Sequence, residues 1–392
     1  MSERFCTNCG TNLTAEAVFC HMCGASIQDV QGVPTAVPVK TDPHPGQAKQ
    51  YAPVSPYRPI RQRPKLLGFA FGIIALFAVP LIIMMSLGAI NFADIGTLDF
   101  DVTTLAYPNV DLDIDNDVGS IDIAFDATLT KLIEVTLDVR GRPGADLADA
   151  KNFVSTVDGA DHITVSFDSG TRSFWFWDKT VFDYDIDIKL HPSVNANYTI
   201  DADTGSITLS TNGIDMLNFS NINMATNTGK VSMNLVGSTN TSIQELELHS
   251  DTGRVDLNLG VFTYLNTDEV IVETDTGGIS LTYVDLIVPD DIVWDIETDT
   301  GSITLSITQN LNLTVESASV FHADTDTGSI TATFIFNSTI GFNIYADTAT
   351  GSISLPGSGS YYENAAYSTA TTLYRFTLTT DTGSVTASAV ET

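Results

Sequence analysis

Four cysteines near the N-terminus have the spacing of a metal site. Cys6 and Cys9 form one C-x2-C pair, Cys20 and Cys23 form a second, and ten residues separate the two pairs. Each pair can make a tight turn in which the glycine that follows aims backbone amides at sulfur. Four thiolates suit a closed tetrahedral zinc site. We therefore predict that these four cysteines bind one structural Zn²⁺.

The segment around them, FCTNCGTNLTAEAVFCHMCG, resembles the small zinc-ribbon domains at the N-termini of many prokaryotic membrane proteins. A module that spans residues 1–27 is too small to bury a core, so the metal would hold it together. Its surface could also dock a cytoplasmic protein, and the two roles are compatible. A redox function is the weakest alternative, because two matched pairs favour metal over disulfide exchange.

A proline-rich segment and a long apolar segment follow the cysteines. Residues 28–65 contain eight of the 14 prolines, which block helix and sheet alike and so predict a semi-extended linker. Residues 66–90 contain no ionisable side chain, and they exceed the ~20 residues that a helix needs to span a bilayer core. We predict a single transmembrane helix there.

The flanking charges predict how this helix is oriented. Four basic residues lie just before it, and the next basic residue along the chain is Lys131. Because basic residues remain on the cytoplasmic side, the N-terminus should be cytoplasmic and residues 91–392 extracytoplasmic. The cysteines agree, since all four lie on the side where thiols stay reduced. We therefore expect a cell-membrane protein with its larger part outside.

A short motif, most often D-T-G-S-I, recurs through the outer region. Four consecutive intervals between its glycines, from Gly205 to Gly301, are each 24 residues long. A fixed period of this size indicates an array of stacked structural units. The glycines of the motif are Gly119, Gly205, Gly229, Gly253, Gly277, Gly301, Gly328, Gly351 and Gly383.

The residues on either side of each glycine indicate strands. Apolar side chains occupy every second position, as Tyr198 and Ile200 do before Gly205 and as Ile207 and Leu209 do after it. This is the pattern of strands with one buried face, and glycine gives the backbone freedom for a corner between them. We predict a mainly β protein, a parallel β-solenoid or β-helix with about 24 residues per rung and a threonine column along one edge.

Three parts of the outer region depart from the repeat. We expect residues 91–109 to form a stalk above the membrane, before a solenoid over 110–392. Residues 126–195 lack the motif but keep the alternation, which predicts irregular rungs or an inserted lobe. The last rung ends almost at Thr392, so little sequence is left to cover its edge, and an open edge is a template for strand pairing.

The outer region resembles the putative-adhesin family of β-solenoid domains from prokaryotic envelope proteins. The resemblance lies in residues 110–125, in the approach IDIKLHPSVNANYTIDADTGSITL at 186–209, and in the serial TGSI rungs. Together with the zinc ribbon and the helix, it implies an archaeal envelope protein. The resemblance implies a surface location and a solenoid, but no particular activity.

D-T-G is also the active-site motif of aspartic proteases, which pair two aspartates that share one proton. Here it occurs six times at the spacing of the repeat, and a catalytic motif does not recur in every rung. We therefore interpret it as a corner and predict no catalytic residue.

Stacked carboxylates at these corners would repel one another unless something offsets the repulsion. Calcium could do so, because it prefers oxygen ligands, and solvated carboxylates that keep the surface soluble are the simpler alternative. The candidate calcium ligands are Asp203, Asp251, Asp275, Asp299 and Asp326.

Two basic residues occupy the same position in neighbouring rungs. Lys230 and Arg254 each follow a corner glycine, so we expect them to stack and to balance the aspartate columns. Glycan-active β-helix enzymes place acidic and basic groups on one face, but they need several cations, and between residues 190 and 374 these two are the only lysine or arginine residues. A glycan-active enzyme is therefore our third alternative for the function.

The sequence favours a membrane-anchored surface protein with a binding or structural role, adhesin-like or a scaffold, and no enzymatic activity. The net charge of −31 argues against nucleic acid as a partner, because phosphates need basic side chains. The expected partners are the membrane, a cytoplasmic protein at the zinc ribbon, and an external ligand or a second copy of the chain. The alternative is a transmembrane sensor that signals through the ribbon.

Overall fold

The computed structural model describes two compact units, Met1–Ile73 and Ile74–Thr392. In the first, only two short backbone segments are described, β1 (Arg4–Phe5) and β2 (Asn12–Leu13), which pair antiparallel. The predicted zinc ligands, the linker and the apolar segment 66–90 lie outside the described residues. None of the helices that the structure describes has the length and apolar character needed to cross a bilayer. In the second unit the described residues are 92–102, 109–142, 145–150, 154–158, 162–169, 182–288, 291–311 and 317–392.

The second unit consists almost entirely of strands, and all of them belong to one 24-stranded sheet. Before the regular repeat come β3 (Ala93–Val102), β4 (Asn109–Val118), β5 (Ile121–Phe125), β6 (Ile133–Gly141), β7 (Val154–Asp158), β8 (His162–Asp168) and β9 (Phe182–Leu190). The repeat comprises β10 (Asn195–Thr204), β11 (Ile207–Ser210), β12 (Asn218–Thr228), β13 (Val231–Asn234), β14 (Ser242–Ile243), β15 (Leu246–Thr252), β16 (Val255–Leu259), β17 (Tyr264–Leu265), β18 (Glu269–Thr276), β19 (Ile279–Val284), β20 (Ile292–Thr300), β21 (Ile303–Gln309), β22 (Ser317–Thr327) and β23 (Ile330–Phe336). The C-terminal end comprises β24 (Gly341–Ser354), β25 (Tyr361–Glu363) and β26 (Thr372–Glu391). The one helix among these residues is a single turn, α2 (Leu147–Ala150). The prediction of a mainly β protein is confirmed.

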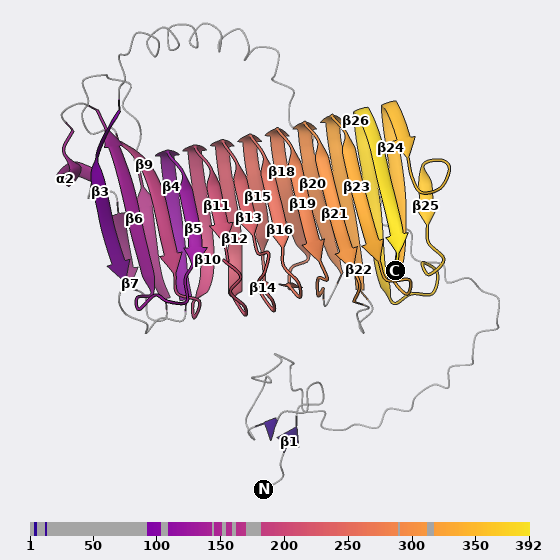
Figure 1. The fold of residues 1–392 in the computed structure, drawn as a ribbon, viewed down its shortest axis with the longest axis horizontal. Coiled ribbons are helices and arrows are strands. Elements are labelled where there is room, and N and C mark those ends of the chain that lie inside the picture. The colour runs from indigo at the N-terminus through magenta and orange to yellow at the C-terminus, as the bar shows by residue number, and fades with distance from the viewer. Residues whose placement is uncertain are drawn as a thin grey trace, which may run out of the picture. The chain divides into compact units, whose positions relative to one another are not determined.

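Successive repeats pair in parallel and in register. Ile200 on β10 lies beside Met224 on β12, and Ile207 on β11 lies beside Val231 on β13. The pairing between the strands before the corner continues in the same way to β22, and the pairing between the strands after the corner continues to β23. Each repeat therefore contributes two strands to the sheet (Figure 1). The strand before the corner glycine extends one ladder, which we call the first ladder, and the strand after the glycine extends another, which we call the second ladder.

The two ladders share one apolar core. Alternate side chains of each strand are fully buried, as the sequence pattern predicts, for example Leu209 and Met233 of the second ladder. Aromatic rings fill the core towards the C-terminal end. The ring centroids of Trp294 and Phe321 lie 5.0 Å apart, and those of Phe321 and Phe376 lie 4.9 Å apart, in stacked arrangements. Register thus places apolar side chains of successive rungs against each other, which removes them from water together.

At the N-terminal end the spatial order of the strands departs from their sequence order. β8 pairs with β4 and β9 pairs with β5, so these strands form a rung outside the first motif-bearing one. β6 lies antiparallel to β9, and β3 lies antiparallel to β6. The expectation of a stalk is therefore wrong for Ala93–Val102. These residues join the sheet because Leu98 is buried and both Phe100 and Val102 pack against the core.

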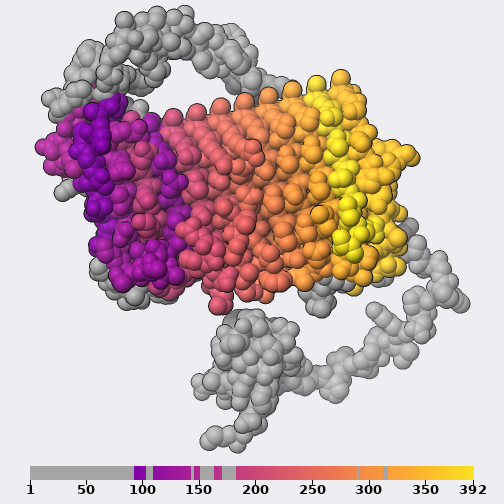
Figure 2. All heavy atoms as spheres, in the orientation of Figure 1, coloured from indigo at the N-terminus to yellow at the C-terminus, as the bar shows by residue number. Residues whose placement is uncertain are grey.

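The C-terminal end departs from sequence order in the same way. β26 pairs with β22 and β23 on one side and with β24 on the other. In Figure 2 the yellow band of β26 accordingly lies between orange rungs. The expectation that the last rung in sequence has the open edge is wrong up to Thr386, because β24 lies outside β26 there. From Ala387 to Glu391 β26 pairs only with β23 among the described strands. The 32-residue interval from Gly351 to Gly383 is longer than the repeat, which lets the chain return inside β24.

The corners of successive rungs approach so closely that only glycine fits. A Cβ added to Gly253 would lie 1.6 Å from the carbonyl oxygen of Gly229, and one added to Gly277 would lie 1.5 Å from that of Gly253. Gly253 also has a φ of 157°, a conformation that side chains disfavour. The same approach, at 1.4 to 1.9 Å from a backbone oxygen, recurs at Gly119, Gly205, Gly229, Gly253, Gly277, Gly301, Gly328, Gly351 and Gly383.

Replacing a corner glycine should therefore be severely destabilising. We expect Gly253→Ala to lower the free energy of unfolding by at least about 3 kcal/mol, because neighbouring rungs must separate to admit the methyl group. Urea unfolding of the full chain, followed by the β-sheet circular dichroism signal, measures this. Gly357→Ala is the control, since its Cβ would make only an ordinary contact 3.5 Å from Tyr362. Equal stability of the two variants would contradict the close packing.

Candidate functional site

The D-T-G corners are joined by a repeated set of hydrogen bonds. The amide of Gly253 donates to the carbonyl oxygen of Thr276 in the next rung at 2.9 Å. The hydroxyl of Thr274 in that rung donates back to the carbonyl oxygen of Gly253 at 3.2 Å. The glycine carbonyl of one rung accepts in this way from the next at Thr226, Ser250, Thr274, Thr298, Thr325, Thr380 and Thr348. Each corner therefore fixes its neighbour through both main-chain and side-chain donors.

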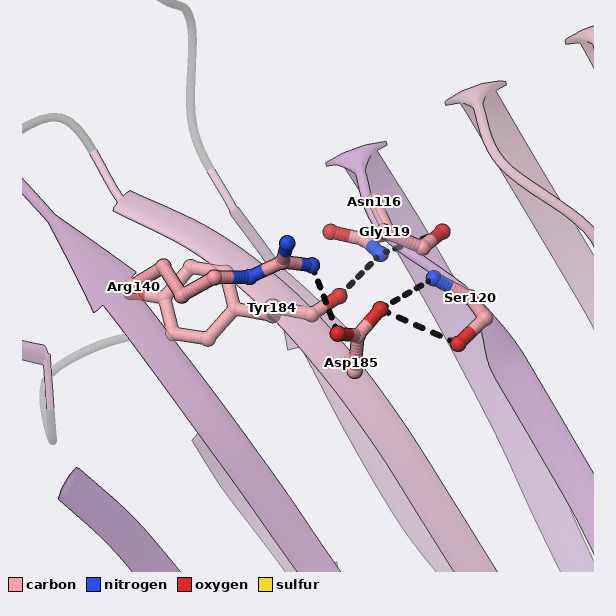
Figure 3. Close-up of polar contacts among 6 residues, drawn as sticks. All are labelled: Asn116, Gly119, Ser120, Arg140, Tyr184 and Asp185. Atoms are coloured by element: carbon pink, nitrogen blue, oxygen red, sulfur yellow. Dashed lines mark hydrogen bonds and ion pairs between the residues drawn. The ribbon is translucent and has the colours of Figure 1, made fainter. Parts of the chain in front are cut away.

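At the N-terminal end of the stack a different set of groups meets the first corner (Figure 3). A Cβ on Gly119 would lie 1.8 Å from the backbone carbonyl oxygen of Tyr184 on β9. The amide nitrogen of the Asn116 side chain donates to the same oxygen at 3.0 Å. Asn116 thus occupies the place of the threonine or serine hydroxyl of the later rungs, because the longer side chain reaches the strand outside it.

Asp185 completes this first corner from β9. One of its carboxylate oxygens accepts from the amide of Ser120 at 2.9 Å and from the Ser120 hydroxyl at 3.0 Å. The other accepts from the Arg140 guanidinium on β6 at 2.6 Å (Figure 3). These contacts join three neighbouring strands, so we assign Asp185 and Arg140 a structural role at this end of the stack.

An acidic column runs along the first ladder, four positions before each corner glycine. Parallel strands lie about 4.8 Å apart, so ionised carboxylates at successive positions repel one another. The column is interrupted by uncharged Ala225, by His249, and by Thr379, whose hydroxyl donates to Asp324 at 2.6 Å. In spatial order the positions are Asp168, Asp115, Asp201, Ala225, His249, Glu273, Glu297, Asp324, Thr379 and Asp347.

Burial and mutual repulsion raise pKa values in this column. Partial burial is the main reason that the pKa values of Asp115 and Asp324 lie above the ordinary aspartate value, and neighbouring carboxylates add to it. Burial, followed by repulsion from Asp295 and Glu273, raises the pKa of Glu297 to about 7. Glu297 is therefore about half protonated at neutral pH, which relieves part of the repulsion.

His249 is the one basic side chain in the column. Its Nε2 lies 2.8 Å from a carboxylate oxygen of Asp251, and its Nδ1 lies 3.7 Å from one of Glu273. The nearby carboxylate of Glu273 is the largest reason that the pKa of His249 rises to about 9, and burial opposes the rise. His249 is therefore charged at neutral pH, and its imidazolium lies between an aspartate of the corner and a glutamate of the next rung.

The two basic residues of the second ladder have a different partner from the one expected. Lys230 Nζ lies 2.7 Å from one oxygen of Asp256, and the guanidinium of Arg254 binds the other. The prediction that Lys230 and Arg254 balance the corner aspartates is thus wrong. Asp256 lies two residues after Arg254 on the strand and is only 14% exposed, so it takes both cations.

The predicted calcium ligands lie at separate corners along the stack. Asp203, Asp275 and Asp299 are exposed, as is Asp326, and Asp203 accepts a hydrogen bond from Asn227 in the next rung at 2.7 Å. Among the described residues no group of three or more histidine, cysteine or acidic side chains is arranged to hold a metal ion. Calcium binding at these residues therefore has no support, and we do not propose it.

Some residues of the site escaped the sequence analysis. Seven of the nine corner glycines have a serine or threonine three positions before them, and this recurrence is the signal for the hydroxyl donors; Asn116 and Ala202 are the exceptions. His249 and Glu273 both lie four positions before a corner glycine, so the 24-residue spacing is the signal that places them side by side. A hollow of about 520 Å³ near Thr339 is lined by serine, threonine and alanine, so it offers no charged group for catalysis.

Neutralising Glu297 should stabilise the protein in a pH-dependent way. The pKa of Glu297 is about 7 in the folded state and 4.5 for the ordinary side chain. The folded state therefore binds the proton more tightly, and stability is lost as the pH rises from about 4.5 to about 7. We expect Glu297→Gln to raise the melting temperature by a few degrees at pH 8 and to leave it unchanged at pH 4. Thermal melts of the full chain at the two pH values measure this. Asp122→Asn, an exposed site with the same change in charge, is the control, and an equal gain in both variants would contradict the assignment.

Removing His249 should have the opposite dependence. Its pKa is raised from 6.5 to about 9, so its stabilising contribution is complete below pH 6.5 and is lost as pH rises through 9. We expect His249→Gln to lower the melting temperature at pH 6 and to differ little from the native chain at pH 10. If the melting temperature of the variant were lower by the same amount at pH 10, the imidazole ring would act through packing and not through charge.

Comparison with known proteins gives a match at the N-terminus. Residues 5–27, which contain the four predicted zinc ligands, match the zinc-ribbon domain family. The predicted ribbon is thus supported, and the match suggests that it binds zinc. No curated protein matches the chain.

Several solved structures resemble the described fold, each at low sequence identity. A putative cell adhesion protein from Clostridium sporogenes is 12% identical, with 75% of this chain and 99% of that one covered and a TM-score of 0.29. A putative adhesin from Bacteroides fragilis is 10% identical, with coverage of 75% and 97% and a TM-score of 0.35. A putative adhesin from Parabacteroides distasonis is 11% identical, with coverage of 74% and 97% and a TM-score of 0.22. Similarities at these TM-scores carry no argument about function, and they give no support to an archaeal source.

Proposed function

We propose that this chain is a membrane-anchored surface protein whose residues 110–392 form a parallel β-solenoid with a binding or structural role, adhesin-like or a scaffold, and no catalytic activity. The observation that carries the proposal is the regular stack of corners. It presents the same small, polar and acidic groups rung after rung, whereas an active site needs one unique constellation. A repeated surface of this kind suits extended contact with a partner.

The sequence of the remaining part supports an anchor and a cytoplasmic module. Residues 66–90 have the length and composition of a transmembrane helix, and the basic residues before them favour a cytoplasmic N-terminus. The zinc ribbon would then face the cytoplasm, with Zn²⁺ holding its four cysteines together and its surface docking a cytoplasmic protein.

The contacts of the basic residues argue against the glycan-active alternative. Lys230 and Arg254 both bind Asp256, whose negative charge offsets part of the positive charge that an acidic sugar would need. Asp256 is also the least exposed of the three, so the two cations converge on one partly buried carboxylate at the surface of the stack. A binding or structural role is therefore the function that the site supports best.

Labelling of lysines on intact cells tests the proposed location. We expect a membrane-impermeant amine reagent to modify Lys131, Lys189 and Lys230, whose side chains are 34%, 41% and 46% exposed. Lys40 and Lys65 should react only after the cells are permeabilised, because they precede the apolar segment. Mass spectrometry of the full-length chain identifies the modified sites.

A variant controls for the assignment of the labelled peptides. Lys230→Arg keeps the charge and the ion pair with Asp256, and it should remove only the label at that position. Labels on Lys40 or Lys65 in intact cells, with none on the outer lysines, would overturn the proposed orientation. No label at any lysine until permeabilisation would overturn the surface location.

A further inference from the structure

The two ends of the sheet differ in how their edge strands are covered. At the C-terminal end β24 pairs with β26 along its whole length on the inner side. On the outer side β25 pairs only with Asn343, Ile344 and Tyr345, and the amide of Ala346 donates to Ser360. Beyond this point, from Asp347 to Ser354, no strand of the described residues pairs with the outer side of β24. We call these eight residues the open edge.

The pattern of the inner rungs shows which groups the open edge presents. In each inner rung the corner glycine donates its amide to the next rung, as Gly328 does to Thr382 at 3.0 Å. The glycine carbonyl accepts a hydroxyl from the next rung, as that of Gly383 does from Thr348. Gly351 is the corner glycine of the outer rung, so its amide and carbonyl both face outwards, and no further rung of the described residues meets them. Such groups form a template for another strand.

The open edge carries less charge than the other rungs, because Asp347 at its start is its one charged residue. Two positions before the corner glycine, where Asp326 and Asp381 stand in the two neighbouring rungs, β24 has Ala349. No charged residue occurs from Thr348 to Tyr362 in a chain whose net charge is −31.

At the opposite end the first ladder ends on β7, which among the described strands pairs only with β8, and the second ladder ends on β3. The β3 edge is protected by charge and by irregular pairing. β3 has exposed Asp94, Asp99 and Asp101, and its register with β6 shifts between Asp94 and Gly96. Exposed charges and bulges are the usual means by which edge strands avoid pairing. Compared with β3, the open edge of β24 therefore offers an added strand less resistance.

We propose that the open edge pairs antiparallel with the open edge of a second copy, which gives an end-to-end dimer. A second copy fits because the stretch is self-complementary about Gly351. There the two glycines exchange both N–H···O hydrogen bonds, as directly opposed residues of an antiparallel pair do. Thr350 of one chain then faces Ser352 of the other, a favourable cross-strand pair, and no carboxylate within the uncharged stretch opposes another.

The symmetry of this pairing limits it to two copies. A twofold axis through the corner at Gly351 exchanges the first and second ladders, so each open edge is used once. Stacking onto the N-terminal end of a further copy would instead give fibres, and the protected β3 edge disfavours it. The second copy is thus the partner of the scaffold proposed above. That this dimer forms at the cell surface rests on the proposed function.

A pair of double variants tests the dimer. Thr350→Lys/Ser352→Lys places lysines directly opposite each other across the twofold axis. Thr300→Lys/Ser302→Lys makes the same changes at the same exposed positions of an inner rung, where Lys230 already occupies the position after a glycine. We expect sedimentation of the full chain in detergent to show a dimer for the native protein and the inner-rung variant. The edge variant should raise the dissociation constant at least tenfold.

The outcomes separate this inference from the proposed function. A native chain that is monomeric, that forms fibres, or that dimerises as tightly with lysines at the edge overturns the end-to-end pairing. Surface labelling of the outer lysines in the same cells leaves the surface role standing in that case. A dimer that the edge variant weakens, in a chain whose lysines cannot be labelled from outside, supports the pairing and overturns the location. Matching circular dichroism spectra of the two variants establish that both are folded.

Discussion

The close approach of glycine to glycine at the corners is the constraint on which the rest of this structure depends. Because the backbone oxygen of one rung occupies the place of a side chain in the next, successive rungs can stand only at strand spacing. That spacing brings both ladders into register at once. The hydroxyl that bonds each glycine carbonyl then satisfies a group that the corner would otherwise leave without a strand partner.

The same register creates the electrostatic problem of the acidic column. Identical positions stack on each other, so a carboxylate that is harmless in one rung repels its neighbours when it recurs. The chain limits this repulsion by three physical means. Ala225 interrupts the column, His249 supplies a positive charge between Asp251 and Glu273, and a raised pKa lets Glu297 carry a proton near neutral pH. The stability of the stack therefore depends on pH through the ionisable side chains of the acidic column, whereas the core is apolar.

The ends of the stack show how a repeat is terminated. Both ends place a rung out of sequence order, with β9 outside β5 and β24 outside β26. At the N-terminal end the Asp185–Arg140 pair and the antiparallel strands β6 and β3 cover the last corner. At the C-terminal end β25 covers only the start of β24. The asymmetry is what distinguishes one end as a surface for another strand.

The sequence by itself determined the features that repeat. The 24-residue spacing, the alternation of apolar residues and the glycine at each corner predicted strands, parallel stacking and the corner positions, because these depend on local periodicity and on neighbours one rung away. It also indicated the zinc ribbon from cysteine spacing. Only the tertiary structure decided that Ala93–Val102 joins the sheet, that β24 and not β26 is the outer strand, and that Lys230 and Arg254 meet at Asp256. The first two contacts join segments whose separation follows no period, and the third depends on which side chains reach each other across neighbouring rungs. Burial and charge in the assembled stack therefore select them.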